Sequence, residues 1–268
     1  MLIDINAYVG HWPFQQLQYN TCKGLLDKMN TYGVDISVIS NLNGIFYKNT
    51  QSANEELIAE IHFDKRFVNR FIPFAVINPI YAGWQKDMDH SIKKLGMKGV
   101  RLYPKYHDYN ITDNACIDAV KQARDLDVPV CFDFRMEDSR QRSWMDIDYV
   151  VGTPKPEWNL KNILPIIAAV PDAKYMVLNM CNNALHTPEE WKLIKSSNML
   201  IDTSGRNISD MKDFLTRYGE DKFAFGTHAP ILDYLTGRLR IESLRPDEAD
   251  EALKERLRSG NAKKMLGI

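Results

Sequence analysis

The sequence has few cysteines and no long apolar run. The first feature argues against a disulfide-bonded protein, and the second argues against a membrane-spanning one. Its four cysteines, Cys22, Cys116, Cys131 and Cys181, lie far apart and form no Cys-x-x-Cys pair, so we expect reduced and mostly buried thiols. No apolar stretch approaches the roughly 18–20 residues that cross a bilayer. Asp4 stands where a signal peptide carries a basic residue. We therefore expect a cytoplasmic protein without a membrane anchor.

The chain also lacks an excess of charge of either sign. It has 34 basic and 35 acidic side chains, a formal net charge of −1, and its basic residues never form a stripe that would bind nucleic acid. No Gly-x-Gly-x-x-Gly follows the first apolar segment, and no phosphate-binding loop is present. We expect a small molecule as the partner, with no nucleic acid and no membrane, and leave a homodimer open.

What the chain does have is a regular alternation of short apolar and amphipathic segments. Eight apolar segments are predicted to be strands: residues 2–8, 34–42, 70–79, 99–106, 128–134, 174–180, 199–205 and 222–228. Helices are predicted over 22–33, 52–63, 84–96, 112–127, 159–171, 187–197, 209–219 and from 245 to the end, with Ser52 and Glu55 forming a capping box. Eight such units favour one α/β domain over residues 1–268, a closed (β/α)8 TIM-like barrel, over an open doubly wound sheet.

Polar residues collect where the predicted strands end. In a barrel of this kind the active site forms at the carboxyl ends of the strands, and side chains two residues apart on a strand share a face. The long irregular segment 135–158 is expected to cover such a site. In strand order, the polar residues are Asn6, Tyr8 and His11; Asn41 and Asn43; Asn78; Arg101, Tyr103, Lys105 and His107; Asp133, Arg135 and Glu137; Asn179, Asn182 and Asn183; Asp202, Ser204 and Arg206; Thr227 and His228.

Four segments resemble the amidohydrolase-related branch of the amidohydrolase superfamily. They are "LIDINAYVGHWPF", "GMKGVRLYPKYHDY", "FAFGTHAPI" and the tail "GNAKKMLGI", and they occur in the family's order along the whole chain. The resemblance implies a distorted (β/α)8 barrel. It also implies an enzyme from a family of metal-dependent hydrolases of amides and lactones and of non-oxidative decarboxylases of aromatic acids.

The family's metal-binding positions carry other residues in this chain. Its His-x-His falls on Asn6 and Tyr8, its next histidine on Asp133, another on Asn179 or Met180, and its last aspartate on His228. Of these, only Asp133 and His228 are good zinc ligands, and two ligands seldom hold a catalytic zinc. We therefore assign no cofactor and do not expect a divalent metal such as zinc. A harder ion in an oxygen-rich site, and a new site built from His11, His107 or a carboxylated Lys105, are left open.

The remaining groups suggest roles without a metal. His228 and Asp133 are the candidate catalytic residues for proton transfer, and Asp133 is expected to orient His228 or to hold it protonated. Arg101 and Arg135 would bind an anion, Tyr8 and Tyr103 would donate hydrogen bonds to a developing oxyanion, and Asn6 and Asn179 complete the predicted substrate-binding set.

These roles lead to two hypotheses of different kinds. The first is a hydrolase of a small carboxylated amide or lactone, or a related decarboxylase. The second is an inactive barrel that binds a small anion as a sensor or carrier. A purely structural role for His228, holding the barrel mouth by hydrogen bonds, is also left open.

Overall fold

Parallel strands form the centre of the structure, a computed structural model that describes residues 1–133, 135–136, 149–150, 153–154, 159–180, 185–205 and 210–268. A separate antiparallel pair consists of β7 (Tyr149–Val150) and β8 (Thr153–Pro154). The parallel strands are β1 (Ile3–Val9), β2 (Ile36–Asn41), β3 (Phe71–Pro73), β4 (Ala75–Val76), β5 (Val100–Leu102), β6 (Val130–Asp133), β9 (Lys174–Leu178), β10 (Asn198–Asp202) and β11 (Phe223–Ala224).

Backbone hydrogen bonds join these strands into a ring. One sheet has the order β1–β2–β3 and the other β11–β10–β9–β6–β5–β4. Residues 71–76 belong to both, because Phe74 N donates to Ile39 O of β2 at 2.8 Å and Ala75 N donates to Gly99 O, just before β5, at 2.9 Å. The first and last strands also meet, since Ile5 N donates to Phe225 O at 3.0 Å.

The closure continues beyond the end of β11. His228 N donates to Asn6 O at 2.7 Å, and Tyr8 N donates to Ala229 O at 2.8 Å. Counting β3 and β4 as one, eight parallel strands follow one another around this ring, which confirms the predicted (β/α)8 architecture. The closure also sets His228 directly beside Asn6 and Tyr8.

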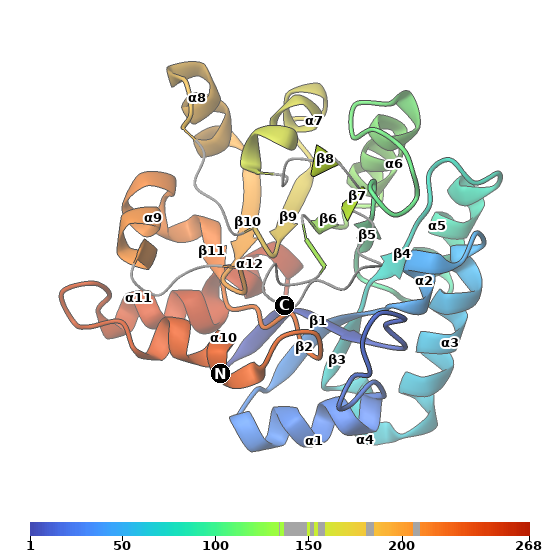
Figure 1. Cartoon of the computed structure of the whole chain (residues 1–268), viewed down its shortest axis with the longest axis horizontal. Helices are drawn as coiled ribbons and strands as arrows, with labels where there is room; N and C mark the ends of the chain where they lie inside the picture. The colour runs from blue at the N-terminus through green and yellow to red at the C-terminus, as the bar shows by residue number, and fades with distance from the viewer. Residues whose placement is uncertain (134, 137–148, 151–152, 155–158, 181–184, 206–209) are drawn as a thin grey trace.

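Helices surround the strands on the outside (Figure 1). Helix α1 is typical: its buried residues Cys22, Leu25, Leu26 and Met29 have helical spacing, and it ends at Gly33 in the left-handed region, φ 67°. The helices are α1 (Cys22–Tyr32), α2 (Asn43–Phe46), α3 (Thr50–Phe63), α4 (Lys65–Val68), α5 (Trp84–Lys93), α6 (Asn114–Asp125), α7 (Leu164–Ala169), α8 (Pro188–Ser196), α9 (Met211–Tyr218), α10 (Tyr234–Glu242), α11 (Glu251–Glu255) and α12 (Asn261–Leu266), with short turns η2 (Leu160–Asn162), η4 (Glu220–Lys222) and the π-helical η5 (Arg256–Gly260).

Some local expectations were wrong. Helix α3 begins at Thr50, two residues before the predicted cap Ser52, because the Asn49 side chain accepts a hydrogen bond from Gln51 N. The predicted helix 159–171 is divided into η2 and α7, and α10 was not predicted at all. The four-residue helices α2 and α4 are too short to produce a periodic pattern.

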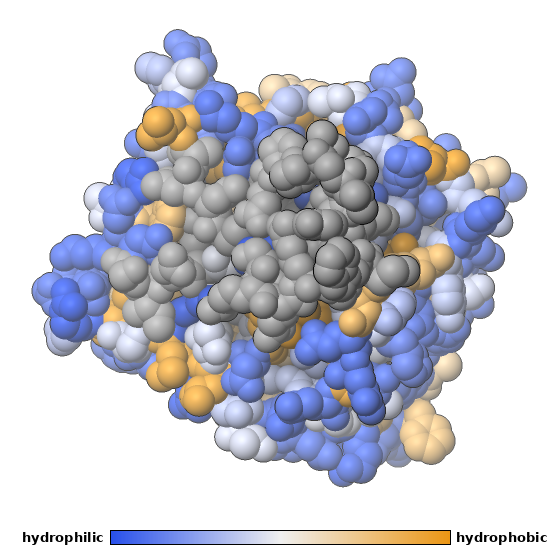
Figure 2. Space-filling view, in the orientation of Figure 1, coloured by the Kyte–Doolittle hydropathy of each residue, from blue (hydrophilic) through white to orange (hydrophobic). Residues whose placement is uncertain are grey.

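Two apolar layers hold the barrel together. The inner layer includes Ile5, Phe74 and Met176, and a larger outer layer packs the strands against the helices. Cys22, Cys116 and Cys131 are free and buried in these layers, as predicted, whereas Cys181 lies outside the described residues. In the described parts of the chain no helix is both long and apolar enough to cross a membrane. On the face in Figure 2, hydrophilic residues predominate around the rim.

The inner layer leads to a prediction about Gly99. A Cβ at this position would lie 2.3 Å from a ring carbon of Phe74, which is fully buried. Gly99→Ala should therefore lower the free energy of unfolding by about 1–3 kcal/mol through overpacking. Urea denaturation measures this change. The control is Gly260→Ala, where the nearest atom to the added Cβ is 3.6 Å away and alanine should be neutral or slightly stabilising. Equal destabilisation of both variants would contradict the packing argument.

Candidate active site

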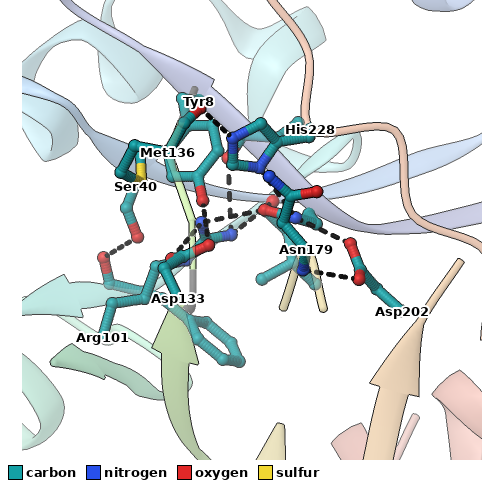
Figure 3. A network of polar contacts seen from close by, with 12 residues as sticks. Tyr8, Ser40, Arg101, Asp133, Met136, Asn179, Asp202 and His228 are labelled. Atoms are coloured by element: carbon teal, nitrogen blue, oxygen red, sulfur yellow. Dashed lines mark hydrogen bonds and ion pairs between the residues drawn. The ribbon is translucent and has the colours of Figure 1, made fainter. Parts of the chain in front are cut away.

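The strand ends bring the predicted site residues into one buried polar network (Figure 3). Asn6 and Tyr8 come from β1, Arg101 from β5, Asp133 from β6, and their side chains meet inside the ring. The other predicted residues, Tyr103, Arg135, Asn179 and His228, follow the ends of β5, β6, β9 and β11. The convergence follows from the topology, because parallel strands of a barrel all end on the same side.

Arg101 places a permanent positive charge at the centre of this network. Its guanidinium carbon lies 4.4 Å from the centre of the Tyr8 ring, and its side chain is fully buried. Nη1 donates to Asn6 Oδ1 at 3.2 Å, and Nη2 lies 3.4 Å from the carbonyl oxygens of Ala7 and Val38. Buried arginine does not lose its proton, so the surrounding groups must present oxygen atoms or aromatic faces to it.

Asp133 is the carboxyl group nearest to this cation. The Tyr8 hydroxyl donates to Asp133 Oδ1 at 2.7 Å, and Asp133 Oδ2 lies 3.8 Å from Arg101 Nη1. Burial raises the pKa of Asp133 to about 6, although the Arg101 charge, the Tyr8 hydrogen bond and the nearby Tyr103 hydroxyl act in the opposite direction. Oδ2 has no hydrogen-bond partner among the described residues. Asp133 can therefore hold or release a proton near neutral pH.

His228 is neutral, and its contacts fix which ring nitrogen carries the proton. Its Nε2 lies 2.7 Å from the carbonyl oxygen of Met136, which can only accept, so Nε2 is the protonated nitrogen. Its Nδ1 lies 3.1 Å from the amide nitrogen of Asn6, which can only donate, so Nδ1 is the acceptor. Burial also lowers the pKa of His228 to about 3.

The two candidate catalytic residues thus have separate partners. Asp133 contacts Tyr8 and Arg101, and His228 contacts Asn6 and Met136, with the His228 ring edge-on to Tyr8 at 5.2 Å. The expectation that Asp133 orients His228 directly is not what the structure shows. Whether either residue transfers a proton in catalysis stays a prediction.

Asp202, at the end of β10, is a residue that the sequence analysis noticed without assigning a role. Its Oδ2 accepts from Asn6 Nδ2 at 2.7 Å and from Ser204 Oγ at 2.6 Å, and its Oδ1 accepts from Asn179 N at 2.7 Å. The signal in the sequence is the polar pair Asp202 and Ser204 directly after an apolar strand. Asn179 and His228 both have positive φ angles, 50° and 60°, which non-glycine residues adopt at a cost and often near functional sites.

The other predicted residues lie around this network. Tyr103 is buried beside Arg101 and Asp133, whose charges act on its hydroxyl, and Arg135 contributes its backbone oxygen, which accepts from Asn179 Nδ2 at 2.5 Å. His107 Nε2 instead contacts Gly44 O at 3.2 Å, and His11 is exposed. Most of the predicted covering segment 135–158 lies outside the described residues.

Solved structures with the same fold cover the whole chain. The 2,6-dihydroxybenzoate decarboxylase from Rhizobium is 15% identical, with a TM-score of 0.73 over 99% of this chain and 98% of its own. A 5-carboxyvanillate decarboxylase from Novosphingobium aromaticivorans is 13% identical, with a TM-score of 0.75 over 100% and 97%. A Staphylococcus aureus protein described as an amidohydrolase is 19% identical, with a TM-score of 0.68 over 100% and 99%. No family model and no curated protein sequence matches.

These structures show that the chain has the fold that the resemblance implies. They also contradict our expectation about cofactors. The Novosphingobium decarboxylase and a dihydroxybenzoic acid decarboxylase from Polaromonas were both solved with bound manganese. Assigning no cofactor was therefore wrong as a reading of the fold, because structures with this fold bind manganese.

Manganese favours several oxygen and nitrogen ligands from carboxylates, imidazoles and water. Among the residues that the structure describes, no three His, Cys, Asp or Glu side chains lie together in a group that could hold a metal ion. Both ring nitrogens of His228 already have partners, and of the Asp133 oxygens only Oδ2 is without a hydrogen bond in the described part of the chain. The described residues alone therefore do not fit a manganese site, and such an ion would need further ligands.

The raised pKa of Asp133 gives a prediction about stability. Between pH 4 and 6 an unfolded Asp133 is ionised while the folded one still holds its proton, so the folded state loses stability as pH rises through this range. Asp133→Asn removes the pH dependence that Asp133 gives to the free energy of unfolding. The altered contact with Arg101 also changes this free energy, but by an amount that does not vary with pH. From pH 4 to 7 the variant should gain about 2 kcal/mol relative to the parent. Urea denaturation across this pH range measures the difference, and parallel curves would show that Asp133 is ionised throughout.

Proposed function

We propose that the network around Asp133 catalyses the decarboxylation or hydrolysis of a small anionic carboxylate, with an aromatic acid as the first substrate class to test. The observation that carries the proposal is Asp133 itself, a buried acid with a pKa of about 6 whose Oδ2 has no hydrogen-bond partner among the described residues. Two of the structural neighbours are named decarboxylases of dihydroxybenzoate and carboxyvanillate, which supports this substrate class.

Decarboxylation of an aromatic acid requires a proton donor at the ring. In the proposed step, protonated Asp133 delivers its proton to the ring carbon that bears the carboxylate, and a C–H bond forms there. The C–C bond to the carboxylate then breaks, its electron pair stays with the ring, and carbon dioxide leaves. A carboxyl group with a pKa near 6 suits this task because it is partly protonated at neutral pH and can recover its proton from solvent.

The surrounding residues have supporting roles in this proposal. Arg101 and Tyr8 would stabilise negative charge as it develops, since their donors are already in place before the reaction. Because Arg101 is fully buried and bonded to Asn6, Ala7 and Val38, it acts through its field more than as a direct carboxylate clamp. Arg135 remains the predicted direct contact for the substrate anion.

Hydrolysis of an amide or lactone is the second form of the proposal. There the same carboxyl group, ionised, would take a proton from the attacking water. The two reactions need opposite protonation states of Asp133, so their pH profiles differ. Decarboxylation should slow as pH rises above about 6, and hydrolysis should slow as pH falls below about 6. Two of the neighbours were solved with bound manganese. The purified protein is therefore analysed for manganese first, and the substrate screen is repeated with added manganese.

A substrate screen tests this proposal. The parent should convert at least one hydroxylated benzoate, amide or lactone, and Asp133→Asn should lower kcat by about 10²- to 10⁴-fold, the usual contribution of a general acid or base. The matched control is Asp118→Asn on α6, whose exposed carboxylate pairs only with Lys121 among the contacts described, and it should retain the parent rate.

Two outcomes would overturn the proposal. The first is turnover that is equally fast in the parent and in Asp133→Asn. The second is binding of aromatic acids, followed by isothermal titration calorimetry, without turnover of any compound at any pH or with added manganese. The second result would favour the alternative of an anion-binding sensor or carrier.

A further inference from the structure

A chain of hydrogen bonds runs from Asp202 through Asn6 to His228. Asp202 Oδ2 accepts from Asn6 Nδ2 at 2.7 Å, and the same amide nitrogen lies 3.1 Å from His228 Nδ1. All three side chains are completely buried. They come from β10, from β1 and from the residues after β11, so the chain connects groups about 200 positions apart in the sequence.

The orientation of the Asn6 amide is fixed from both ends. Arg101 Nη1, which can only donate, lies 3.2 Å from Asn6 Oδ1. The Asp202 carboxylate, which accepts, lies against Nδ2 on the other side. Rotating the amide by 180° would place an NH₂ group against a cation and a carbonyl oxygen against a carboxylate. Asn6 therefore presents only N–H groups to His228 Nδ1.

The surroundings of Asp202 are built to hold its carboxylate in this position. Besides Asn6, it accepts from Ser204 Oγ and from Asn179 N, so both oxygens are occupied. Gly226 lies so close that a Cβ there would be 2.7 Å from Asp202 Cβ and Oδ2. The glycine of "FAFGTHAP" thus lets the backbone after β11 approach the carboxylate.

We propose that Asp202 is a positioning residue that, through the Asn6 amide, holds His228 in the neutral form with its proton on Nε2. Asp202 has no exposed surface, and both of its oxygens already accept hydrogen bonds, so it acts only through its partners. Its effect is to make His228 a hydrogen-bond donor on the side that faces Met136. The role in catalysis rests on the function proposed above, but the hydrogen-bond pattern does not.

Nitrogen-15 NMR of the His228 ring tests this inference without any substrate. In the parent, prepared without paramagnetic manganese, Nε2 should appear protonated and Nδ1 unprotonated. In Asp202→Asn, an amide NH₂ replaces the acceptor that faces Asn6, so the Asn6 orientation and the fixed His228 pattern should both be lost. Circular dichroism and urea denaturation show whether this variant is folded.

A paired exchange keeps the test decisive if Asp202→Asn folds poorly. In the double variant Asn6→Asp with Asp202→Asn, donor and acceptor are swapped, and the carboxylate at position 6 also faces Arg101. His228 Nδ1 now faces an acceptor, so it should gain a proton. Three results would contradict the inference: the double variant keeps Nδ1 unprotonated, the parent carries its proton on Nδ1, or a folded Asp202→Asn keeps the protonation pattern of the parent.

The control is Asp4→Asn, which removes a different buried carboxylate from the same barrel. Asp4 accepts from the backbone N–H groups of Asn6 and Thr227 and from the Thr227 hydroxyl. None of these bonds involves the side-chain amide of Asn6. Asp4→Asn should leave the proton of the His228 ring on Nε2. If this variant also loses the fixed protonation pattern, the effect of Asp202→Asn comes from lost stability, and the inference is wrong. Turnover is measured separately, so a failed substrate screen leaves the NMR result interpretable.

Discussion

The buried charge of Arg101 is the constraint on which the rest of the site depends. A guanidinium without solvent contact is costly unless acceptors surround it, and here the acceptors come from β1, β2 and β6. The Tyr8 ring covers its face, and Asn6 must direct its oxygen toward it. Once Asn6 is oriented in this way, its amide nitrogen necessarily points toward Asp202 and His228. One charge thus sets the polarity of a network that extends across the barrel.

Sharing a fold with decarboxylases does not by itself assign their chemistry to this chain. The identities are 13% to 19%, and one barrel scaffold supports many reactions through the residues at its strand ends. Catalysis is therefore proposed from the contacts that Asp133 makes with Tyr8 and Arg101. A carboxyl group that is buried and incompletely hydrogen-bonded is unusual in a purely structural role, because both features cost stability.

The fold was predictable from the sequence to a greater extent than the site. Alternating segments and their spacing are local properties, so eight strands and the positions of most helices followed from them. The meeting of residues 6, 8, 101, 133 and 228 followed from the topology of a barrel. The partners of each side chain did not, because the choice between Tyr8 and His228 as the partner of Asp133 depends on angstrom-scale placement between distant strands. Asp202 was visible as a polar strand end, but nothing local linked it to Asn6, which is 196 positions away.

Three carboxyl groups are buried in the described part of the barrel, and burial raises the pKa of each, so geometry must decide between them. Burial raises the pKa of Asp4 to about 7, higher than the pKa of Asp133, so acidity alone would select Asp4 as the proton donor at neutral pH. Its oxygens, however, accept bonds from Thr227 and from the backbone of Asn6. Asp202 is likewise occupied by Asn6, Ser204 and Asn179. Among the three, Asp133 alone has an oxygen without a hydrogen-bond partner in the described part of the chain, and only an available oxygen can pass a proton to a bound molecule.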